Sequence, residues 1–460
     1  MNTLIVLSSI GVLALFSEML NFKKAMLPLI MLGLAVAFIV NVMDWNLNKS
    51  FYNNMMTVDN YAVAFTGLLI VMTLLWFIIS PDFFHEPTSR VDHFALIIFA
   101  LIGGQLMTSY NNMLMLFLGI EILSIPMYIL AGSNKSDLGS NEASLKYFLM
   151  GAFATGFLLF GITLIYGATG SFNIQYIATF ILAQQGSFSV MIIAGVLMML
   201  IGLAFKVSAV PFHFWAPDVY VGSPTVITAF MSTVVKIAAF AGFFRLFFIC
   251  FNNGGAAWTA TIWVLAALTI IVGNITAVSQ TNFKRMLAYS SIAHAGYMLL
   301  AVLTATGSKE YSQGAVLFYA VAYSISSITS FAILLLVSHV TKNDSIDSFN
   351  GLAKKNPLLS IVTILAMLSL AGIPPMAGFF AKYYVFTAAL QQHYTGLVLI
   401  AVAGSLVGVF YYFRIIIALF KPEMGDIHIP VNTVFRVFLV LTSFAALLLG
   451  IMPQLVVGLL

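Results

Sequence analysis

Apolar residues are gathered in long runs along almost the whole chain, and short polar segments separate the runs. A helix that crosses a bilayer needs roughly 20 apolar residues, so each run predicts one membrane-spanning helix. The predicted spans, numbered from 1 to 14, are 3–20, 25–42, 60–79, 93–109, 112–131, 146–168, 189–220, 225–251, 258–279, 284–304, 312–340, 357–390, 396–420 and 432–458. We expect the first run to be retained, because it has no positive stretch before it and no small-residue cleavage site. The pattern predicts an all-α integral membrane protein with about fourteen transmembrane helices.

Two of the predicted spans that are longer than the bilayer needs, 189–220 and 357–390, contain prolines in their interior. Pro211 and Pro217 lie in span 7, and Pro374 and Pro375 lie in span 12. A proline inside a helix removes a backbone hydrogen bond, and the freed groups persist at membrane depth only where they line a cavity or meet protein partners. Two proline-broken helices in corresponding halves are typical of a transporter's binding region. An ordinary proline kink in a packing helix is the alternative.

Basic residues in the predicted loops are divided unevenly between the two sides of the membrane. The even-numbered loops contain Lys49 and Lys309. The odd-numbered loops contain Lys23, Lys24, Arg90, Lys135, Lys284, Arg285, Lys342, Lys354, Lys355 and Lys421. Because cytoplasmic loops are enriched in Lys and Arg, we predict that the odd-numbered loops are cytoplasmic and that both termini lie on the other side.

The composition fits this interpretation and excludes several kinds of function. The chain is 61% hydrophobic and 7% charged, whereas about a quarter of the residues of a soluble domain are charged. The single cysteine, Cys250, excludes a disulfide framework and a thiolate cluster for iron–sulfur ligation. The histidines are scattered, and neither a dinucleotide-binding fingerprint nor a phosphate-binding loop is present. We therefore expect the chain itself to bind no nucleotide, flavin, metal or nucleic acid.

Charged residues inside the spans are the main functional signal. Those near span ends, Lys146, Arg245 and Arg436, are expected to extend toward the membrane surface. Others lie in the middle of apolar runs or beside the prolines, and these are Glu121, Lys206, Lys236 and Lys382. Because a charge at the bilayer centre costs about 3 kcal/mol, their number indicates a polar pathway within the membrane.

The chemistry of buried lysine suits proton transfer. Burial disfavours the charged ammonium, whereas a nearby carboxylate favours it. If their helices touch, Glu121 and Lys206 form such an opposed pair, which would let Lys206 hold or release a proton. Arginine does not deprotonate at accessible pH and could not do this. The alternative is a static ion pair that only fixes helix packing.

Other residues could carry the proton onward. His294 lies in the segment AYSSIAHAGYML with Tyr289, and histidine can shuttle protons through either ring nitrogen near neutral pH. A hydrogen-bonded packing role for His294 is the alternative. His213 lies at the end of the broken span 7, where we expect a water-filled vestibule.

Four segments carry a resemblance to a known family. They are LFLGIEILSIPMYIL, FKVSAVPFHFWAPDVYVGSPTVITAFMSTVVKIAAF, NFKRMLAYSSIAHAGYMLL and LSLAGIPPMAGFFAKYYVF. They resemble the antiporter-like membrane subunits of respiratory complex I, and among these subunit N, also called subunit 2, of proton-translocating NADH:quinone oxidoreductase. The resemblance covers roughly residues 90–420.

The resemblance implies a fold of two inverted five-helix repeats, each with one broken helix. Residues 1–90 would form an N-terminal three-helix bundle, 91–251 the first repeat, 258–420 the second repeat and 432–460 a C-terminal helix. Lys206 precedes its proline whereas Lys382 follows its own, so we expect the symmetry at the charged sites to be approximate.

Residue roles also follow from the resemblance. It implies that Glu121 and Lys206 are the paired carboxylate and lysine, that Lys236 is a bridging lysine and that Lys382 is the terminal lysine. His294 and Tyr289 would lie between them. Lys146 matches a lysine that the family carries at the start of span 6, which weakens its interpretation as a surface-seeking side chain.

The implied function is proton translocation without redox chemistry in this chain. The expected partners are the other membrane-arm subunits, including M, K and J, together with the lipid of a bacterial inner membrane. NADH, FMN, iron–sulfur clusters and quinone would belong to the complex as a whole. The alternatives are a subunit of a multisubunit cation/proton antiporter, a structural scaffold of the membrane arm and, more distantly, a membrane subunit of a hydrogenase-type complex.

Overall fold

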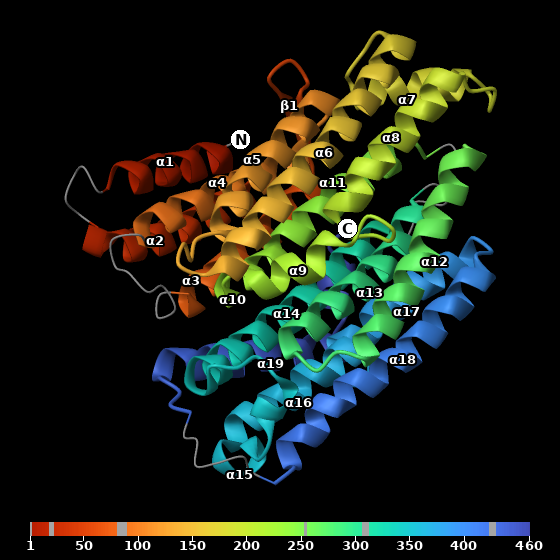
Figure 1. Cartoon of the computed structure of the whole chain (residues 1–460). Coiled ribbons are helices and arrows are strands. Elements are labelled where there is room, and N and C mark those ends of the chain that lie inside the picture. The colour runs from red at the N-terminus through yellow and green to blue at the C-terminus, as the bar shows by residue number, and fades with distance from the viewer. Residues whose placement is uncertain (1, 18–22, 81–89, 253–254, 306–311, 423–428) are drawn as a thin grey trace.

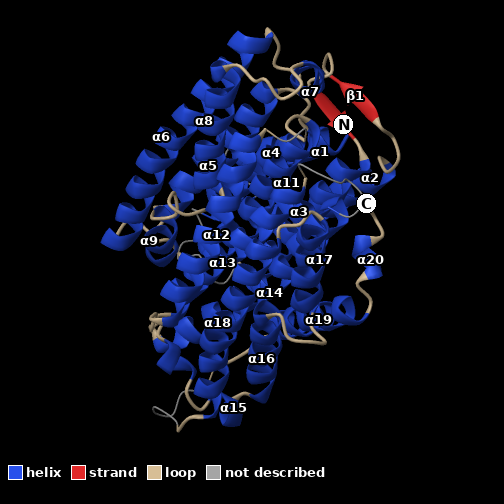
Figure 2. Ribbon diagram, turned by 90° about the vertical axis from the view of Figure 1, so that its right-hand side faces the viewer, coloured by secondary structure: helices blue, strands red, loops and turns tan. Residues whose placement is uncertain are grey.

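The computed structural model describes residues 2–17, 23–80, 90–252, 255–305, 312–422 and 429–460. Helices run side by side through most of the molecule, and the described strands form one small hairpin (Figures 1 and 2). The structure describes the backbone but not the side chains of Lys23, Lys24 and Arg90, which lie at helix starts. Lys309 lies outside the described residues.

The N-terminal part consists of three helices and the hairpin. The elements are α1 (Asn2–Phe16), α2 (Lys23–Met43), β1 (Lys49–Phe51), β2 (Met56–Val58) and α3 (Asn60–Ile79). The two strands are antiparallel, with Lys49 opposite Val58. The turn between them contains Asn53 and Asn54 with positive φ angles, a conformation that asparagine tolerates better than most residues. The hydropathy pattern did not predict this hairpin.

The next part contains the first broken helix. Its elements are α4 (Arg90–Ser109), α5 (Met113–Ala131), α6 (Leu138–Thr169), α7 (Ile174–Ala183), α8 (Val190–Lys206), α9 (Trp215–Gly222), α10 (Thr225–Phe230), the π-helical turn η2 (Met231–Val235) and α11 (Lys236–Ile249). Helix α6 begins eight residues before the predicted span 6, because Asp137 caps it by accepting a hydrogen bond from the Gly139 amide. The short helix α7 was not predicted.

The last part contains the second broken helix. Its elements are α12 (Ala256–Val278), α13 (Phe283–Thr304), α14 (Ser312–Thr341), the 3₁₀ turn η3 (Ile346–Phe349), α15 (Leu352–Lys355), α16 (Pro357–Ala371), α17 (Ala377–Gln391), α18 (Thr395–Phe420), α19 (Thr433–Ile451) and α20 (Gln454–Val457). Helix α14 contacts α10 and η2 on one side and α16, α17 and α19 on the other. Helix α14 therefore connects the part that contains the first broken helix with the part that contains the second (Figure 1).

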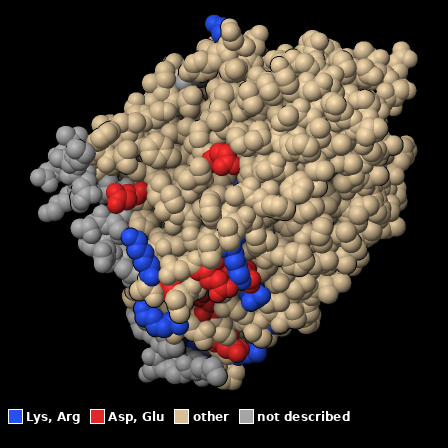
Figure 3. Space-filling model, turned by 45° about the horizontal axis from the view of Figure 1, so that its top comes forward, with Lys and Arg blue, Asp and Glu red and all other residues tan. Residues whose placement is uncertain are grey.

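Many of these helices can cross a membrane. Within the described residues, eleven helices are long and apolar enough to do so. The most buried of them are α10–α11, α13 and α14, whereas α2, α6 and α18 bury about a third or less of their apolar window. Phe153 on α6 and Leu406 on α18, for example, are 71% and 68% exposed. Most of the face in Figure 3 carries no charged side chain. Such an apolar exterior is expected when lipid is the solvent.

The predicted spans 7 and 12 are interrupted where the sequence predicts. The first break lies between Lys206 and Trp215, and the second between Ala371 and Ala377. Both contain a cis X-Pro bond, Val210–Pro211 and Pro374–Pro375. In the first break the amide of Val210 donates to Thr269 Oγ1 of α12 at 2.9 Å. The freed backbone thus meets protein partners, as the membrane environment requires.

Glycines allow close packing at the second break. Gly372 ends α16 with φ +81°, a left-handed conformation in which glycine is strongly preferred. A Cβ at Gly450 of α19 would overlap the carbonyl of Pro375. Helix α19 therefore lies directly against the backbone of the break.

Candidate functional site: a chain of buried lysines

Lys206 is the last residue of α8, and its side chain is buried, with 6% exposure. Its ammonium donates a hydrogen bond to Ser124 Oγ of α5. The same nitrogen lies 5.7 Å from the ring centroid of Tyr128, one turn further along α5. Lys206 thus faces α5, as the sequence interpretation of a Glu121–Lys206 pair requires.

Glu121 lies one turn before Ser124 on α5 and is half-buried. Its carboxylate interacts electrostatically with Lys206. Among the described residues, however, the two form no direct ion pair. The serine hydroxyl occupies the position next to the ammonium that the sequence interpretation gave to the carboxylate.

Lys236 follows the π-helical turn at the start of α11 and is 4% exposed. Its ammonium donates to the Ser291 carbonyl of α13 at 2.5 Å and also to Ser291 Oγ. Tyr323 of α14 donates to the same hydroxyl at 3.0 Å. One serine therefore joins Lys236 to α13 and α14. Single π turns inside helices occur often at functional sites.

His294 lies one turn beyond Ser290 and Ser291 on α13. Its Nδ1 is 2.7 Å from Tyr319 Oη of α14, and its Nε2 is 3.2 Å from Tyr412 Oη of α18. Tyr412 in turn forms a hydrogen bond with Ser290 Oγ. Tyr289, the other predicted member of this region, is half-buried and packs against the apolar core. The histidine is thus the centre of a hydroxyl network that does not include Tyr289.

Lys382 lies on α17, and its ammonium reaches back across the second break. It donates to the Ala371 carbonyl of α16 at 2.7 Å and to Ser405 Oγ of α18 at 2.8 Å. It also lies 5.2 Å from the ring centroid of Tyr297. Gly372 makes this approach possible, because a Cβ there would lie 2.9 Å from Lys382 Cδ and 3.1 Å from Nζ.

The lysine ammonium groups occupy equivalent positions in the two broken helices. Lys206 is the last residue of α8, and the Lys382 ammonium binds the carbonyl of the last residue of α16. Both cations therefore lie at the C-terminal end of the first half-helix, where the helix dipole favours positive charge. The different order of lysine and proline in the two segments hides this similarity in the sequence.

Other candidate residues lie away from this chain. Lys146 of α6 pairs with Glu142 at 2.7 Å and with Asp218 of α9 at 2.9 Å, and its side chain is 40% exposed. Asp218 also pairs with Arg285 of α13 at 3.3 Å. His213 lies buried in the first break, with its ring tilted against that of Phe214 and the ring centroids 4.4 Å apart.

Two basic residues differ from the sequence interpretation. Arg245 does not extend to the surface. It is buried and pairs with Asp59 at 2.8 Å, because its position on α11 faces the start of α3. Lys284, predicted in a loop, is the second residue of α13 and is buried. It donates to the carbonyls of Val221 at 3.2 Å and Ser223 at 2.5 Å, at the end of α9. No feature of the sequence indicates that Lys284 is buried, because a lysine at a helix start normally faces solvent.

The described residues contain no group of three or more His, Cys, Asp or Glu side chains that could hold a metal ion. The arrangement instead consists of ammonium groups, hydroxyls and one imidazole, which can bind and pass protons. Together with the two broken helices, it defines an antiporter-like membrane protein.

Comparisons with known proteins identify the family. A family model described as NADH:quinone oxidoreductase/Mrp antiporter, TM, matches residues 110–408. NADH-quinone oxidoreductase subunit N of Cytophaga hutchinsonii is 44% identical over 457 residues, which are 99% of this chain and 98% of the relative. The subunit N of Flavobacterium psychrophilum is 41% identical over 461 residues, covering 100% of both chains. The chain belongs to the NADH-quinone oxidoreductase subunit N family.

Solved structures agree with this assignment. A chain in respiratory complex I from Thermus thermophilus with bound aureothin is 34% identical with a TM-score of 0.84, and the match covers 99% of this chain and 98% of that one. A chain of the Mrp complex from Dietzia has a TM-score of 0.88 at 19% identity, covering 99% of this chain and 95% of that one. At that identity the likeness is one of fold.

Proposed function

We propose that the chain is the proton-translocating subunit N of a bacterial NADH:quinone oxidoreductase, driven by quinone reduction in other subunits. The observation that carries the proposal is the environment of Lys206, Lys236 and Lys382. Each is buried, each donates to a serine hydroxyl, and in the described part of the chain none has a carboxylate within ion-pair distance.

Hydroxyl partners suit a lysine that changes its protonation state. A carboxylate holds the proton on the ammonium, whereas a hydroxyl can donate to the neutral amine as well as accept from the ammonium. Either state of the lysine is then hydrogen-bonded. A buried polar group without a hydrogen-bond partner is costly. A hydroxyl partner therefore lowers the free-energy cost of the lysine releasing its proton.

The route continues from Lys236 to Lys382 through α13, α14 and α18. Ser291 and Tyr323 lie beside Lys236, and the ring centroid of Tyr323 is 5.0 Å from that of His294. The His294 ring lies 5.8 Å from that of Tyr297, which in turn faces Lys382. In the proposed sequence Lys206 moves out of the electrostatic influence of Glu121, protons pass Lys236, and Lys382 releases them on the far side.

The proposed architecture is two inverted five-helix repeats within fourteen spans. The same pairings occur in both parts of the chain: α4 packs on α5 as α12 packs on α13, and α6 packs on α8 and α9 as α14 packs on α16 and α17. Helix α11 contacts α4 as α18 contacts α12. The proposed number of fourteen is the sum of the eleven long apolar helices among the described residues, helix α1 and the two broken helices, each counted as one span.

The proposed setting is the membrane arm of the complex. Subunits M, K and J are the expected neighbours, and the bacterial plasma membrane, with both termini on its non-cytoplasmic side, is the expected location. NADH, FMN, the iron–sulfur clusters and quinone would be bound by other subunits. The apolar exposed faces of α6 and α18 suit contact with lipid or with such subunits.

The proposal is tested by alanine substitutions at Lys206 and Lys236 in the whole complex. Lys135→Ala is the matched control, because Lys135 is an exposed loop lysine. NADH-driven proton uptake by inverted membrane vesicles is measured per assembled complex. Each buried-lysine variant should lose uptake by about tenfold or more, on the scale of a lost proton-transfer group, and the control should not. Full uptake in both variants would refute the mechanism.

The same experiment separates the rival functions. A scaffold role predicts less assembled complex but unchanged proton uptake per complex. A cation/proton antiporter subunit is the second candidate, and the fold shared with the Mrp chain favours it. That function predicts sodium-dependent transport in the absence of NADH, whereas the subunit N relatives support the first candidate.

A further inference from the structure

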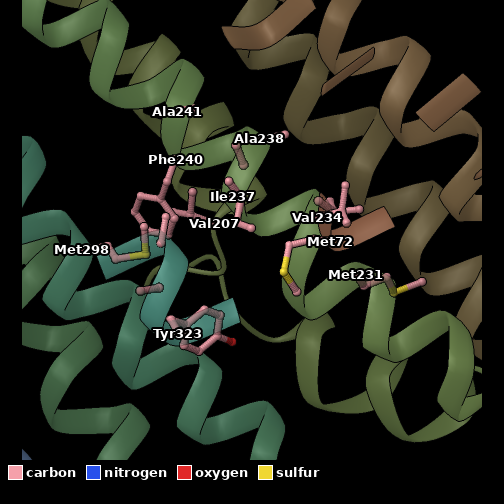
Figure 4. Packing of buried hydrophobic residues seen from close by; sticks show 14 of the residues in the cluster. Met72, Val207, Met231, Val234, Ile237, Ala238, Phe240, Ala241, Met298 and Tyr323 are labelled. Carbon is pink, nitrogen blue, oxygen red and sulfur yellow. The ribbon is translucent and has the colours of Figure 1, made fainter. Parts of the chain in front are cut away.

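Among the described residues, no hydrogen bond links the site of Lys206 to that of Lys236. Lys206 bonds Ser124 on α5, and Lys236 bonds Ser291 on α13. The residues that follow the two lysines, Val207 and Ile237, belong to one packed apolar cluster with Phe240 and Met298 (Figure 4). Apolar side chains offer no hydrogen-bond partner that would hold a water molecule between the two lysines. A proton therefore needs another way between the two lysines.

Three buried tyrosines lie along such a detour. Tyr128 on α5 is the residue over which the Lys206 ammonium lies. Its ring contacts that of Tyr147 on α6 edge to face, with centroids 4.7 Å apart. Tyr147 is stacked on Trp215 at 4.6 Å, and Trp215 contacts Tyr220 of α9 at 6.4 Å. We call Tyr128, Tyr147 and Tyr220 the tyrosine row.

Both ends of the tyrosine row meet the partners of a lysine. The Tyr128 hydroxyl lies beside that of Ser124, which binds Lys206. The Tyr220 hydroxyl lies beside that of Ser291, which binds Lys236. Tyr147 lies between them, with its ring in contact with those of Tyr128 and Trp215. The row therefore extends from one lysine site to the other.

The Tyr147 hydroxyl, in the middle of the row, forms no hydrogen bond among the described residues. Tyr147 is fully buried, and its Oη has no hydrogen-bond partner there. The hydroxyl of Tyr128 also lacks a bond of standard geometry. Gly151 of α6 leaves the space that the Tyr128 hydroxyl occupies, because a Cβ at Gly151 would overlap it. Since buried hydroxyls are normally satisfied by protein or water, we infer that water bonds the hydroxyls of Tyr128 and Tyr147.

We propose that the tyrosine row, with water between its hydroxyls, carries protons between Lys206 and Lys236. This inference rests on the proposed function. In each step a hydroxyl oxygen accepts a proton from one neighbour as its own proton passes to the next. The ammonium of one lysine becomes the amine and the other amine becomes the ammonium. No tyrosine changes its net charge or oxidation state.

The test is removal of single hydroxyls in the whole complex. Tyr147→Phe keeps the ring that packs on Trp215 and Tyr128, so a purely structural role predicts an unchanged complex. Tyr220→Phe is the second variant. Tyr110→Phe is the matched control, because Tyr110 is equally buried but its hydroxyl donates to the Gly242 carbonyl at 2.8 Å, away from the row.

Proton uptake per assembled complex should fall about fivefold or more in Tyr147→Phe and Tyr220→Phe. It should stay at the parent level in Tyr110→Phe. The double variant should be no worse than either single variant, since both interrupt one series. Uptake at the parent level in both single variants would overturn the tyrosine row. If Lys206→Ala still abolished uptake in that case, the proposed function would stand without it.

Discussion

Gly372→Ala is a direct test of how the second break holds Lys382. Gly372 has φ +81°, and a Cβ would lie 2.9 Å from Lys382 Cδ and 3.1 Å from Nζ. The left-handed conformation costs a non-glycine residue roughly 1 kcal/mol. The steric contact must in addition displace a side chain whose ammonium makes two hydrogen bonds. Losing one such charged bond costs about 1.5–3 kcal/mol.

Gly170→Ala separates these two effects. Gly170 ends α6 with φ +71°, and a Cβ there meets no atom within 4 Å. It carries the same backbone cost without the contact. Both variants should lower the thermal inactivation temperature of the purified complex, and Gly372→Ala should lower it further. Proton uptake per complex should fall in Gly372→Ala and be retained in Gly170→Ala. Equal uptake in the two variants would refute the reasoning about Lys382.

Two further predictions concern charges outside the proposed route. Asp59→Ala leaves Arg245 buried without its ion-pair partner, at a cost of about 3 kcal/mol, and removes the N-cap of α3, at about 1 kcal/mol. Thermal inactivation should occur at a lower temperature, and Asp59→Asn, which keeps a capping oxygen, should have a smaller effect. Lys284→Met leaves two carbonyls at the end of α9 without their donor, which should cost about 1–3 kcal/mol. Less complex should assemble, with unchanged proton uptake per complex, and lost uptake at normal assembly would place Lys284 in the route.

The sequence predicted those features that depend on local composition. Apolar runs predicted the long helices, and Pro211, Pro374 and Pro375 predicted the two breaks. The burial of Lys206, Lys236 and Lys382 followed from the apolar residues around them. Each of these signals lies within a single segment, so no knowledge of neighbouring helices was needed.

The remaining features depend on contacts between segments distant in sequence. Arg245 is buried because α11 faces Asp59, and Lys284 is buried because α9 ends beside it. The serines that bind the lysines could not be recognised from the sequence, because their role depends on how α5, α13 and α18 pack against the lysines. Hydropathy also missed the hairpin β1–β2, whose turn is set by Asn53 and Asn54 rather than by an alternating pattern.

The π-helical turn Met231–Val235 fixes the angular position of Lys236. Each residue of an α-helix turns the chain by about 100°, and a π turn is in effect one additional residue within the helix. If this turn relaxed to α geometry, everything after it would rotate by about that angle. Lys236 would then leave Ser291, and Arg245 would leave Asp59. The number of residues between Thr225 and Lys236 is therefore as important as their identity, since a single insertion or deletion there would misdirect both cations at once.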